Sequence, residues 1–219
     1  MDVKAFIFDL DGTLIDSEML WVASMVAYLA DHGCVTTRKE MMKVVVGHSW
    51  FDIYRKVIAL APNLAIVTIQ EMAVQLRSYY IKQCENSGSI LIDSSVALLK
   101  ELAKSHPVII VSGSPHNDVE NAVRIMEAEA SVKFVLGAED YPHGKPAPDG
   151  FLLGAKKLGV EPKHCVVFED SSAGVRSAKA AGMYCVALSR PVEHPQDLSP
   201  ADWILEDLAD FSLDKLSYK

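Results

Sequence analysis

Apolar residues occur along the chain in short uninterrupted runs, separated by stretches in which they recur every three or four positions. Continuous apolar runs of this length are typical of parallel strands buried on both faces. The first run ends in acidic residues, and the later ones end in polar or glycine-rich segments. The pattern predicts buried strands at Val3–Leu10, Pro107–Val111, Phe134–Leu136, Cys165–Phe168 and Tyr184–Leu188.

Helical patterns lie between these runs. Asp93–Ser95 offers capping side chains ahead of an apolar stripe that begins at Val96. A second helix is expected from Pro148 to Gly159, and a third from Ser171 to Gly182, because glycine is common just after a helix end. Strands that alternate with helices in this way predict an α/β fold with a doubly wound parallel sheet.

One long stretch breaks the alternation. It contains helical patterns but no convincing buried strand, so the simplest interpretation is a helical insertion after the first strand. We expect an α/β core domain at residues 1–16 and 91–219 and a helical domain at residues 17–90. The expected helices of the insertion lie at 19–31, 38–46, 51–61 and 69–84.

The charge of the chain limits its partners. Of the 219 residues 50% are hydrophobic and 23% charged, and the formal net charge is −8. Nucleic-acid binding draws heavily on Lys and Arg that neutralise phosphates, so we expect no nucleic-acid partner. A small anionic substrate would need a local positive site. The sequence does not indicate the oligomeric state.

The cysteines and the N-terminus point to a reducing compartment. The four cysteines form no C-x-x-C pair, and the seven histidines show no zinc-site spacing. The first residues lack the features of a signal peptide, and no apolar run approaches the ~20 residues of a membrane span. We therefore expect a cytoplasmic protein without a membrane partner.

Polar and acidic residues follow the predicted strands. In an open α/β sheet, ligands bind beyond the carboxyl ends of the strands, so side chains at these ends are expected to meet at one edge. The set consists of Asp9 and Asp11 after the first strand, Ser112–Ser114 after the second, Lys145 beyond the third, and Glu169–Asp170 after the fourth.

This set suits phosphoryl transfer. Carboxylates on neighbouring strand ends are the hard oxygen ligands that Mg²⁺ prefers. One carboxylate can attack phosphorus as a nucleophile, and a second, two residues on, can serve as general acid and base. Ser112 and the amides of Gly113 and Ser114 can hold phosphate oxygens, and Lys145 adds a positive charge. The sequence therefore predicts a small phosphorylated metabolite as substrate.

Each feature alone has a more ordinary interpretation. Asp11–Gly12 is a common turn sequence, and Ser112 could be only a helix cap. A lysine such as Lys145 is usually solvated, and Glu169–Asp170 could merely favour a helix N-terminus. Their coincidence at successive strand ends favours a site.

Four segments resemble motifs of the haloacid dehalogenase superfamily, within its β-phosphoglucomutase-like and sugar-phosphatase branch. The resemblance covers nearly the whole chain and implies a Rossmann-like core with a helical cap of the C1 type inserted after the first strand. It also implies Mg²⁺ as cofactor. The segments are Phe8–Leu14 (FDLDGTL), Val111–Ser114 (VSGS), Gly144–Asp149 (GKPAPD) and Phe168–Ser171 (FEDS).

The resemblance also implies roles for individual residues. Asp9 is similar to the family's nucleophile and Asp11 to its general acid and base. Ser112, Gly113 and Lys145 resemble the phosphate-binding residues. The implied metal ligands are Asp9, the backbone carbonyl of Asp11, Asp170, and Glu169 in or next to the coordination shell. Gly47, His48 and Trp50 resemble the cap loop that contacts substrate.

The chain departs from the mutase pattern at two cap positions. Where the family's mutase carries a histidine and an arginine, this sequence has Trp21 and Trp50. A mutase needs positive groups there to bind a second phosphate, so we expect a phosphatase. A phosphosugar mutase, a haloacid dehalogenase and a non-catalytic phosphometabolite-binding protein remain alternatives. Asp11 argues against the dehalogenase, which has no alkoxide to protonate.

Overall fold

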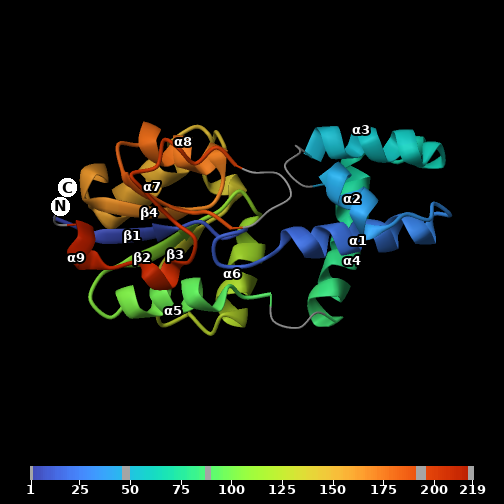
Figure 1. The fold of residues 1–219 in the computed structure, drawn as a ribbon. Coiled ribbons are helices and arrows are strands. Elements are labelled where there is room, and N and C mark those ends of the chain that lie inside the picture. The colour runs from blue at the N-terminus through green and yellow to red at the C-terminus, as the bar shows by residue number, and fades with distance from the viewer. Residues whose placement is uncertain (1, 46–49, 87–89, 191–195, 217–219) are drawn as a thin grey trace. The chain divides into compact units, whose positions relative to one another are not determined.

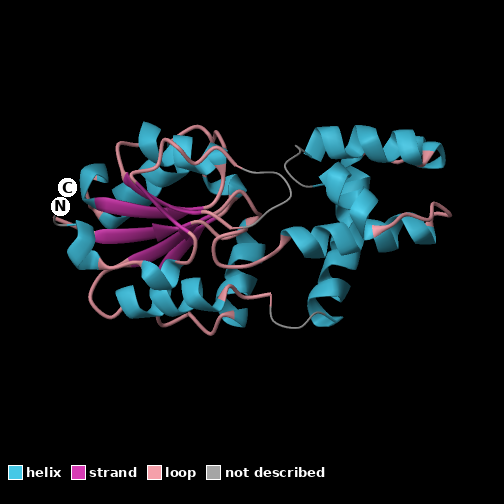
Figure 2. Ribbon diagram, in the orientation of Figure 1, coloured by secondary structure: helices cyan, strands magenta, loops and turns pink. Residues whose placement is uncertain are grey.

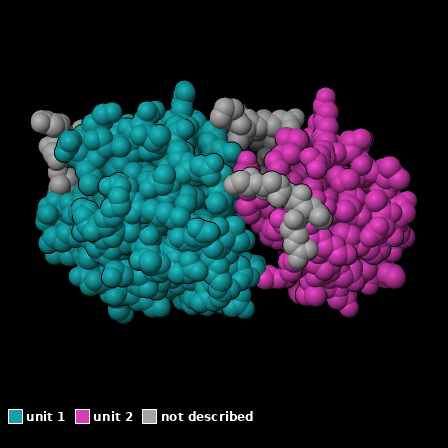
Figure 3. Space-filling view, turned by 90° about the horizontal axis from the view of Figure 1, so that it is seen from below, with its two compact units in different colours: residues 1–15, 91–219 teal, residues 16–90 magenta. Residues whose placement is uncertain are grey.

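The computed structural model describes residues 2–45, 50–86, 90–190 and 196–216. These residues form two compact units, one of residues 1–15 and 91–219 and the other of residues 16–90 (Figure 3). The second unit is inserted in the chain between the first strand and the first helix of the first unit.

The first unit contains a parallel sheet flanked by helices (Figure 2). Over the described residues the sheet has six strands in the order β3-β2-β1-β4-β5-β6, with β1 pairing in parallel to both β2 and β4. This order confirms the predicted doubly wound α/β fold. The strands are β1 (Ala5–Phe8), β2 (Val108–Val111), β3 (Val132–Leu136), β4 (Cys165–Glu169), β5 (Tyr184–Leu188) and β6 (Trp203–Leu205).

Helices cover both faces of this sheet, with α7 and α8 on one face and α5 and α6 on the other (Figure 1). The α-helices of the unit are α5 (Asp93–Leu102), α6 (His116–Ile125), α7 (Asp149–Leu158), α8 (Ser172–Ala180) and α9 (Leu213–Leu216). Short 3₁₀ helices lie at η2 (Ala138–Asp140), η3 (Pro162–His164) and η4 (Leu208–Asp210).

The helix ends follow the predicted signals in two cases and differ in one. Gly159 follows α7 with a left-handed φ of 69°, as expected for a C-terminal glycine. Ser171 caps α8 through a side-chain bond from the amide of Gly174. The expectation of capping side chains at Asp93–Ser95 was wrong: Ile92 holds the cap position and Asp93 already lies in the first turn of α5.

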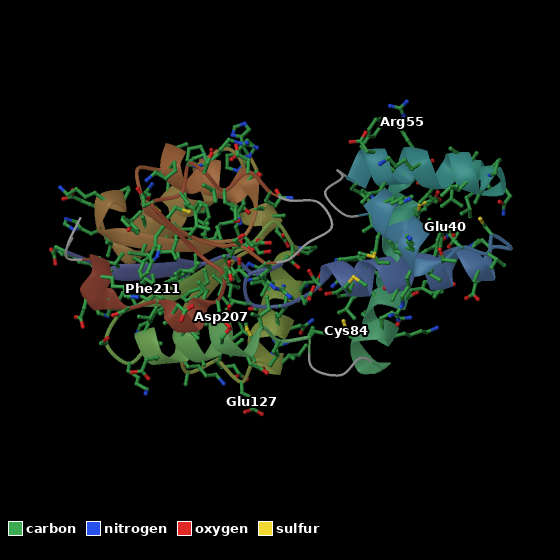
Figure 4. The ribbon with its side chains drawn as sticks, viewed as in Figure 1. Glu40, Arg55, Cys84, Glu127, Asp207 and Phe211 are labelled. Carbon is green, nitrogen blue, oxygen red and sulfur yellow. The ribbon has the colours of Figure 1, made fainter. Side chains whose placement is uncertain are left out.

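Alternate strand residues enter two apolar layers. Ile7 and Val167 pack with Phe151 of α7 on one face of the sheet. On the other face Phe168 stacks on Phe8 and meets the ring of Phe211. Phe211 follows η4 and is labelled in Figure 4. Both layers bury β1 and β4 completely and thereby fix the strands whose ends carry the acidic residues.

Over the described residues, the regular elements of the second unit are all helices. Its elements are α1 (Glu18–Asp31), α2 (Arg38–Val45), α3 (Trp50–Leu60), η1 (Pro62–Ile66) and α4 (Ile69–Asn86). They enclose a separate apolar core around Met25, Tyr28, Met41 and Val57. Helices α2 and α4 begin in the same way. A threonine directly before each helix donates its amide to a glutamate in the first turn, Thr37 to Glu40 and Thr68 to Glu71, both at 2.8 Å. No helix of the described residues is long and apolar enough to cross a membrane.

Candidate active site

Asp9 directly follows β1 and lies against the end of β4. Its amide donates to the carbonyl of Phe168 at 2.9 Å. The rings of Phe8 and Phe168 stack with centroids 4.4 Å apart, which holds the two strand ends in register. Because β4 ends at Glu169 and Asp170 follows, the carboxylates of three acidic residues meet at this edge of the sheet.

Lys145 supplies the positive charge of this edge. Its Nζ forms an ion pair with Asp9 and a second one with Glu169, 2.5 Å from Oε1. The side chain of Lys145 is 15% exposed and that of Glu169 only 1%. Burial alone would lower the pKa of Lys145, but the two carboxylates raise it above its usual value. Lys145 is therefore a permanent ammonium group.

One ammonium group does not balance the carboxylates around it. The pKa of Asp9 is raised from 3.8 to about 7, chiefly by burial; Lys145 opposes this rise, and the charges of Glu169 and Asp11 add to it. The site thus carries an excess of buried negative charge. Such a site favours an additional cation.

Glu169 is held by donors on both carboxylate oxygens. Oε1 accepts from Lys145, and Oε2 accepts from the amides of Asp170 and Ser171 and from the Ser171 hydroxyl, each at 2.9 Å. The carboxylate also lies against the Cα of Gly174, where a Cβ would be 1.7 Å from Oε1. Glu169 therefore fixes the turn that leads from β4 into α8.

Asp170 lies against the loop that follows Asp9. A Cβ added at Gly12, whose φ is +87°, would be 2.0 Å from Asp170 Oδ2, and the Thr13 hydroxyl lies 3.4 Å from Oδ1. Only glycine suits both that backbone conformation and that space. One carboxylate oxygen from each of Asp9, Glu169 and Asp170 lies within 4.8 Å of the others. This grouping can hold a hard metal ion.

Asp11 faces the loop after β2. Its Oδ2 accepts hydrogen bonds from the hydroxyls of Ser112 at 3.1 Å and Ser114 at 2.7 Å. Tyr141 is buried behind this loop and donates its hydroxyl to the carbonyl of Ser112 at 2.7 Å. Ser112 is therefore no helix cap: α6 begins after Pro115, and the serine hydroxyl serves the site.

A family model describing haloacid dehalogenase-like hydrolases matches residues 3–182. The chain belongs to this family. It is also 32% identical to hexitol phosphatase A of Escherichia coli over 98% of this chain and 96% of that one. Fructose-1-phosphate phosphatase YqaB of the same organism is 32% identical over 82% of this chain and 93% of that one. The family and these phosphatase relatives place the chain among the hydrolases of phosphoric monoesters.

Solved structures of the haloacid dehalogenase-like fold are similar over the whole chain. A putative β-phosphoglucomutase from Thermotoga maritima superposes with a TM-score of 0.78 at 20% identity, covering 98% of this chain and 99% of that one. A family IA hydrolase of the superfamily from Entamoeba histolytica gives a TM-score of 0.82 at 21% identity, covering 98% and 97%. At this identity the likeness concerns the fold alone.

Most of the residues expected for this haloacid dehalogenase-like site lie together in the first unit. Asp9, Glu169 and Lys145 form the ion-paired centre, and Asp170 and Asp11 flank it through the contacts described above. Gly113 lies exposed between two serines that bond to Asp11. The carboxylate of Asp11 bonds to the serine loop and is not part of the three-carboxylate grouping of the described residues.

The expected cap residues are only partly described. Gly47 and His48 lie outside the described residues. Trp50 begins α3 and is partly buried against the core of the helical unit. Trp21 is likewise packed on that core, and its ring stacks on Tyr80 with centroids 4.1 Å apart.

Three residues of the site were missed by sequence reasoning. Thr13 lies inside the first motif and could have been found from it. Gly174 stands early in a helix, where a glycine signals a close approach of another group. Tyr141 offered no signal, because its role depends on the carbonyl that it meets in the folded chain.

Proposed function

We propose that the protein is a magnesium-dependent phosphatase that hydrolyses a small sugar or polyol phosphate through a phosphorylated Asp9. The observation that carries this proposal is the buried Asp9 carboxylate, ion-paired with Lys145 beside Glu169 and Asp170. A buried carboxylate at a strand end, next to a fixed positive charge, suits a nucleophile toward an anionic phosphate.

The residues present fit a magnesium ion. Asp9 and Asp170 would hold it with the backbone carbonyl of Asp11, whereas Glu169, whose oxygens already accept four donors, would lie beside it. The excess of buried carboxylates supports a bound cation. When bound, Mg²⁺ neutralises charge on the phosphate and on the carboxylates.

The chain's own groups account for both halves of the reaction. An Asp9 oxygen forms a bond to phosphorus while the bond to the ester oxygen breaks, and Asp11 donates a proton to that oxygen. Asp11 then takes a proton from water, whose oxygen bonds to phosphorus and releases Asp9. Ser112, the Gly113 amide and Lys145 hold the phosphate oxygens during both steps.

The relatives support the substrate class. Two of them act, by name, on hexitol phosphates and fructose 1-phosphate. We propose that the helical unit serves as the cap that recognises the leaving group, with Gly47, His48 and Trp50 as its contacts. We also propose that the protein is cytoplasmic.

The test is hydrolysis of a panel of phosphorylated sugars, polyols and nucleotides by the purified protein. We expect phosphate release with Mg²⁺ that is highest on sugar or polyol phosphates, is abolished by EDTA and is poorly restored by Ca²⁺. Asp9→Asn should be inactive, whereas the control Asp207→Asn, at the cap of η4, should be active. Full activity after EDTA, or in Asp9→Asn, would contradict the proposal.

A further inference from the structure

Two serine hydroxyls converge on one oxygen of Asp11. Ser112 Oγ lies 3.1 Å and Ser114 Oγ 2.7 Å from Asp11 Oδ2, and both donate to it. The amide of Ser114 donates to Ser112 Oγ at 2.9 Å and fixes the direction of that hydroxyl. Ser114 thus touches Asp11 directly and also orients the second serine.

Ser112 and Ser114 cannot both go on donating to Asp11 once Ser112 binds a phosphate. A hydroxyl has a single proton to donate. If Ser112 donates to a phosphate oxygen, as proposed above, it no longer donates to Asp11. Ser114 is then the hydroxyl that stays with the carboxylate, and it makes the shorter of the two bonds.

The backbone that carries Ser114 is anchored independently of its hydroxyl. The Ala138 amide donates to the Ser114 carbonyl at 2.9 Å, and Tyr141 donates to the Ser112 carbonyl at 2.7 Å. Removal of the Ser114 hydroxyl therefore leaves the loop in place. The hydroxyl contributes an orientation of Asp11, and the loop does not need it for its own fold.

We infer that Ser114 is a positioning residue for Asp11, the general acid and base. Its hydroxyl keeps Asp11 Oδ2 in place when Ser112 turns to the phosphate. This inference rests on the proposed function. It adds an orienting group to the role of Asp11.

The proton and bond changes follow from this assignment. As Asp9 bonds to phosphorus, the electron pair of the breaking bond stays on the ester oxygen, which takes the proton from the Asp11 carboxyl group and leaves as an alcohol. The Asp11 carboxylate then accepts a proton from water as the water oxygen bonds to phosphorus. The bond from phosphorus to Asp9 breaks with its electron pair on the Asp9 carboxylate. Ser114 donates to Oδ2 throughout.

The test is the dependence of kcat/KM on the leaving group in Ser114→Ala. Alkyl phosphates need the proton of Asp11 and activated aryl phosphates do not, so we expect a loss of about tenfold to a hundredfold on alkyl phosphates, the size of one charged hydrogen bond. Nitrophenyl phosphate should change by less than about threefold, because its leaving group needs no acid. Ser114→Thr, which keeps the hydroxyl, should restore the alkyl activity.

Two further variants separate this inference from the proposed function. Asp11→Asn should show the same contrast with a larger loss, and adding Ser114→Ala to it should cause no further loss on alkyl phosphates. Equal losses on both ester classes in Ser114→Ala, with the contrast kept in Asp11→Asn, would overturn the role of Ser114 alone. Equal losses in Asp11→Asn would instead overturn the general acid of the proposed function. Tyr141→Phe serves as the structural control and should affect both ester classes alike.

Discussion

The carboxylate of Glu169 lies directly over the Cα of Gly174 in the first turn of α8. A side chain at this position would place its Cβ 1.7 Å from Glu169 Oε1, a distance that no pair of unbonded atoms tolerates. The same carboxylate accepts hydrogen bonds from the amides of Asp170 and Ser171, just before α8, and pairs with Lys145. Because Gly174 has no side chain, Glu169 can lie where it pairs with Lys145.

Gly174→Ala should lower activity although alanine is the better helix former. The added methyl displaces Glu169 and with it Lys145, and misplacement by about 1 Å can cost about a hundredfold in rate. The thermal midpoint with and without Mg²⁺ gives a second readout, because ion binding stabilises the native state and a displaced site binds less. The control is Gly144→Ala, whose Cβ meets nothing within 4 Å. Wild-type activity and an unchanged Mg²⁺ effect in Gly174→Ala would contradict this role.

The order of elements could be read from the sequence because burial on both faces leaves a continuous apolar run. β2, β4 and β5 were predicted to within one residue at each end, and β1 is shorter than its apolar run. β6 was missed because it is a three-residue edge strand whose side chains are only partly buried or exposed. An edge strand of this length depends on its neighbour and lacks a periodic signal of its own.

The convergence of Asp9, Lys145 and Glu169 was predictable for a general reason. Parallel strands end at one edge, so residues after them meet whatever the details of packing. The contacts of Gly174 and Tyr141 were not predictable, because they depend on how closely the folded chain brings Gly174 to the Glu169 carboxylate and the Tyr141 hydroxyl to the Ser112 carbonyl. The two serines that bond to Asp11 were visible as a motif, but their shared oxygen was not.

His116 and Asp140 should make stability depend on pH. His116 Nδ1 lies 2.6 Å from Asp140 Oδ2, and this hydrogen bond raises the pKa of His116. A raised pKa contributes stability below the usual value near 6.5, and the contribution is lost as pH rises through the higher folded value. Burial raises the pKa of Asp140, but the hydrogen bonds from His116 and Gly137 lower it by more, so this pKa lies below its usual value. The contribution of Asp140 to stability is therefore present above about pH 4 and is lost only as the pH falls below that.

We therefore expect His116→Gln to reduce the free energy of unfolding at pH 6 and to have little effect at pH 9. The ring of His116 is 33% exposed, so the difference should be below about 1 kcal/mol after solvent screening. Urea unfolding at both pH values measures it. His143→Gln is the matched control, since His143 pairs with Asp149 at 2.9 Å while 74% exposed. An equal effect of His116→Gln at both pH values would rule out the charged pair.

The protein should release phosphate and should not isomerise hexose phosphates. A mutase must bind a second phosphate, but the two positions where the family's mutase carries cationic groups are Trp21 and Trp50, both packed on the helical core. A tryptophan cannot balance a phosphate dianion, and an unpaired buried charge costs several kcal/mol. The measurement supplies β-glucose 1-phosphate with catalytic glucose 1,6-bisphosphate and follows glucose 6-phosphate and free phosphate together. Isomerisation that outruns phosphate release would show a mutase.

The most direct test of the phosphatase mechanism is to trap the phosphorylated enzyme. The protein is mixed with substrate and Mg²⁺, quenched in acid within one turnover and reduced with borohydride, which converts an aspartyl phosphate to homoserine. Peptide mass spectrometry should find homoserine at position 9 only when substrate is present, and the Asp9→Asn protein should show none. Turnover without any modification of Asp9, or with homoserine at a different aspartate, would contradict phosphoryl transfer to Asp9.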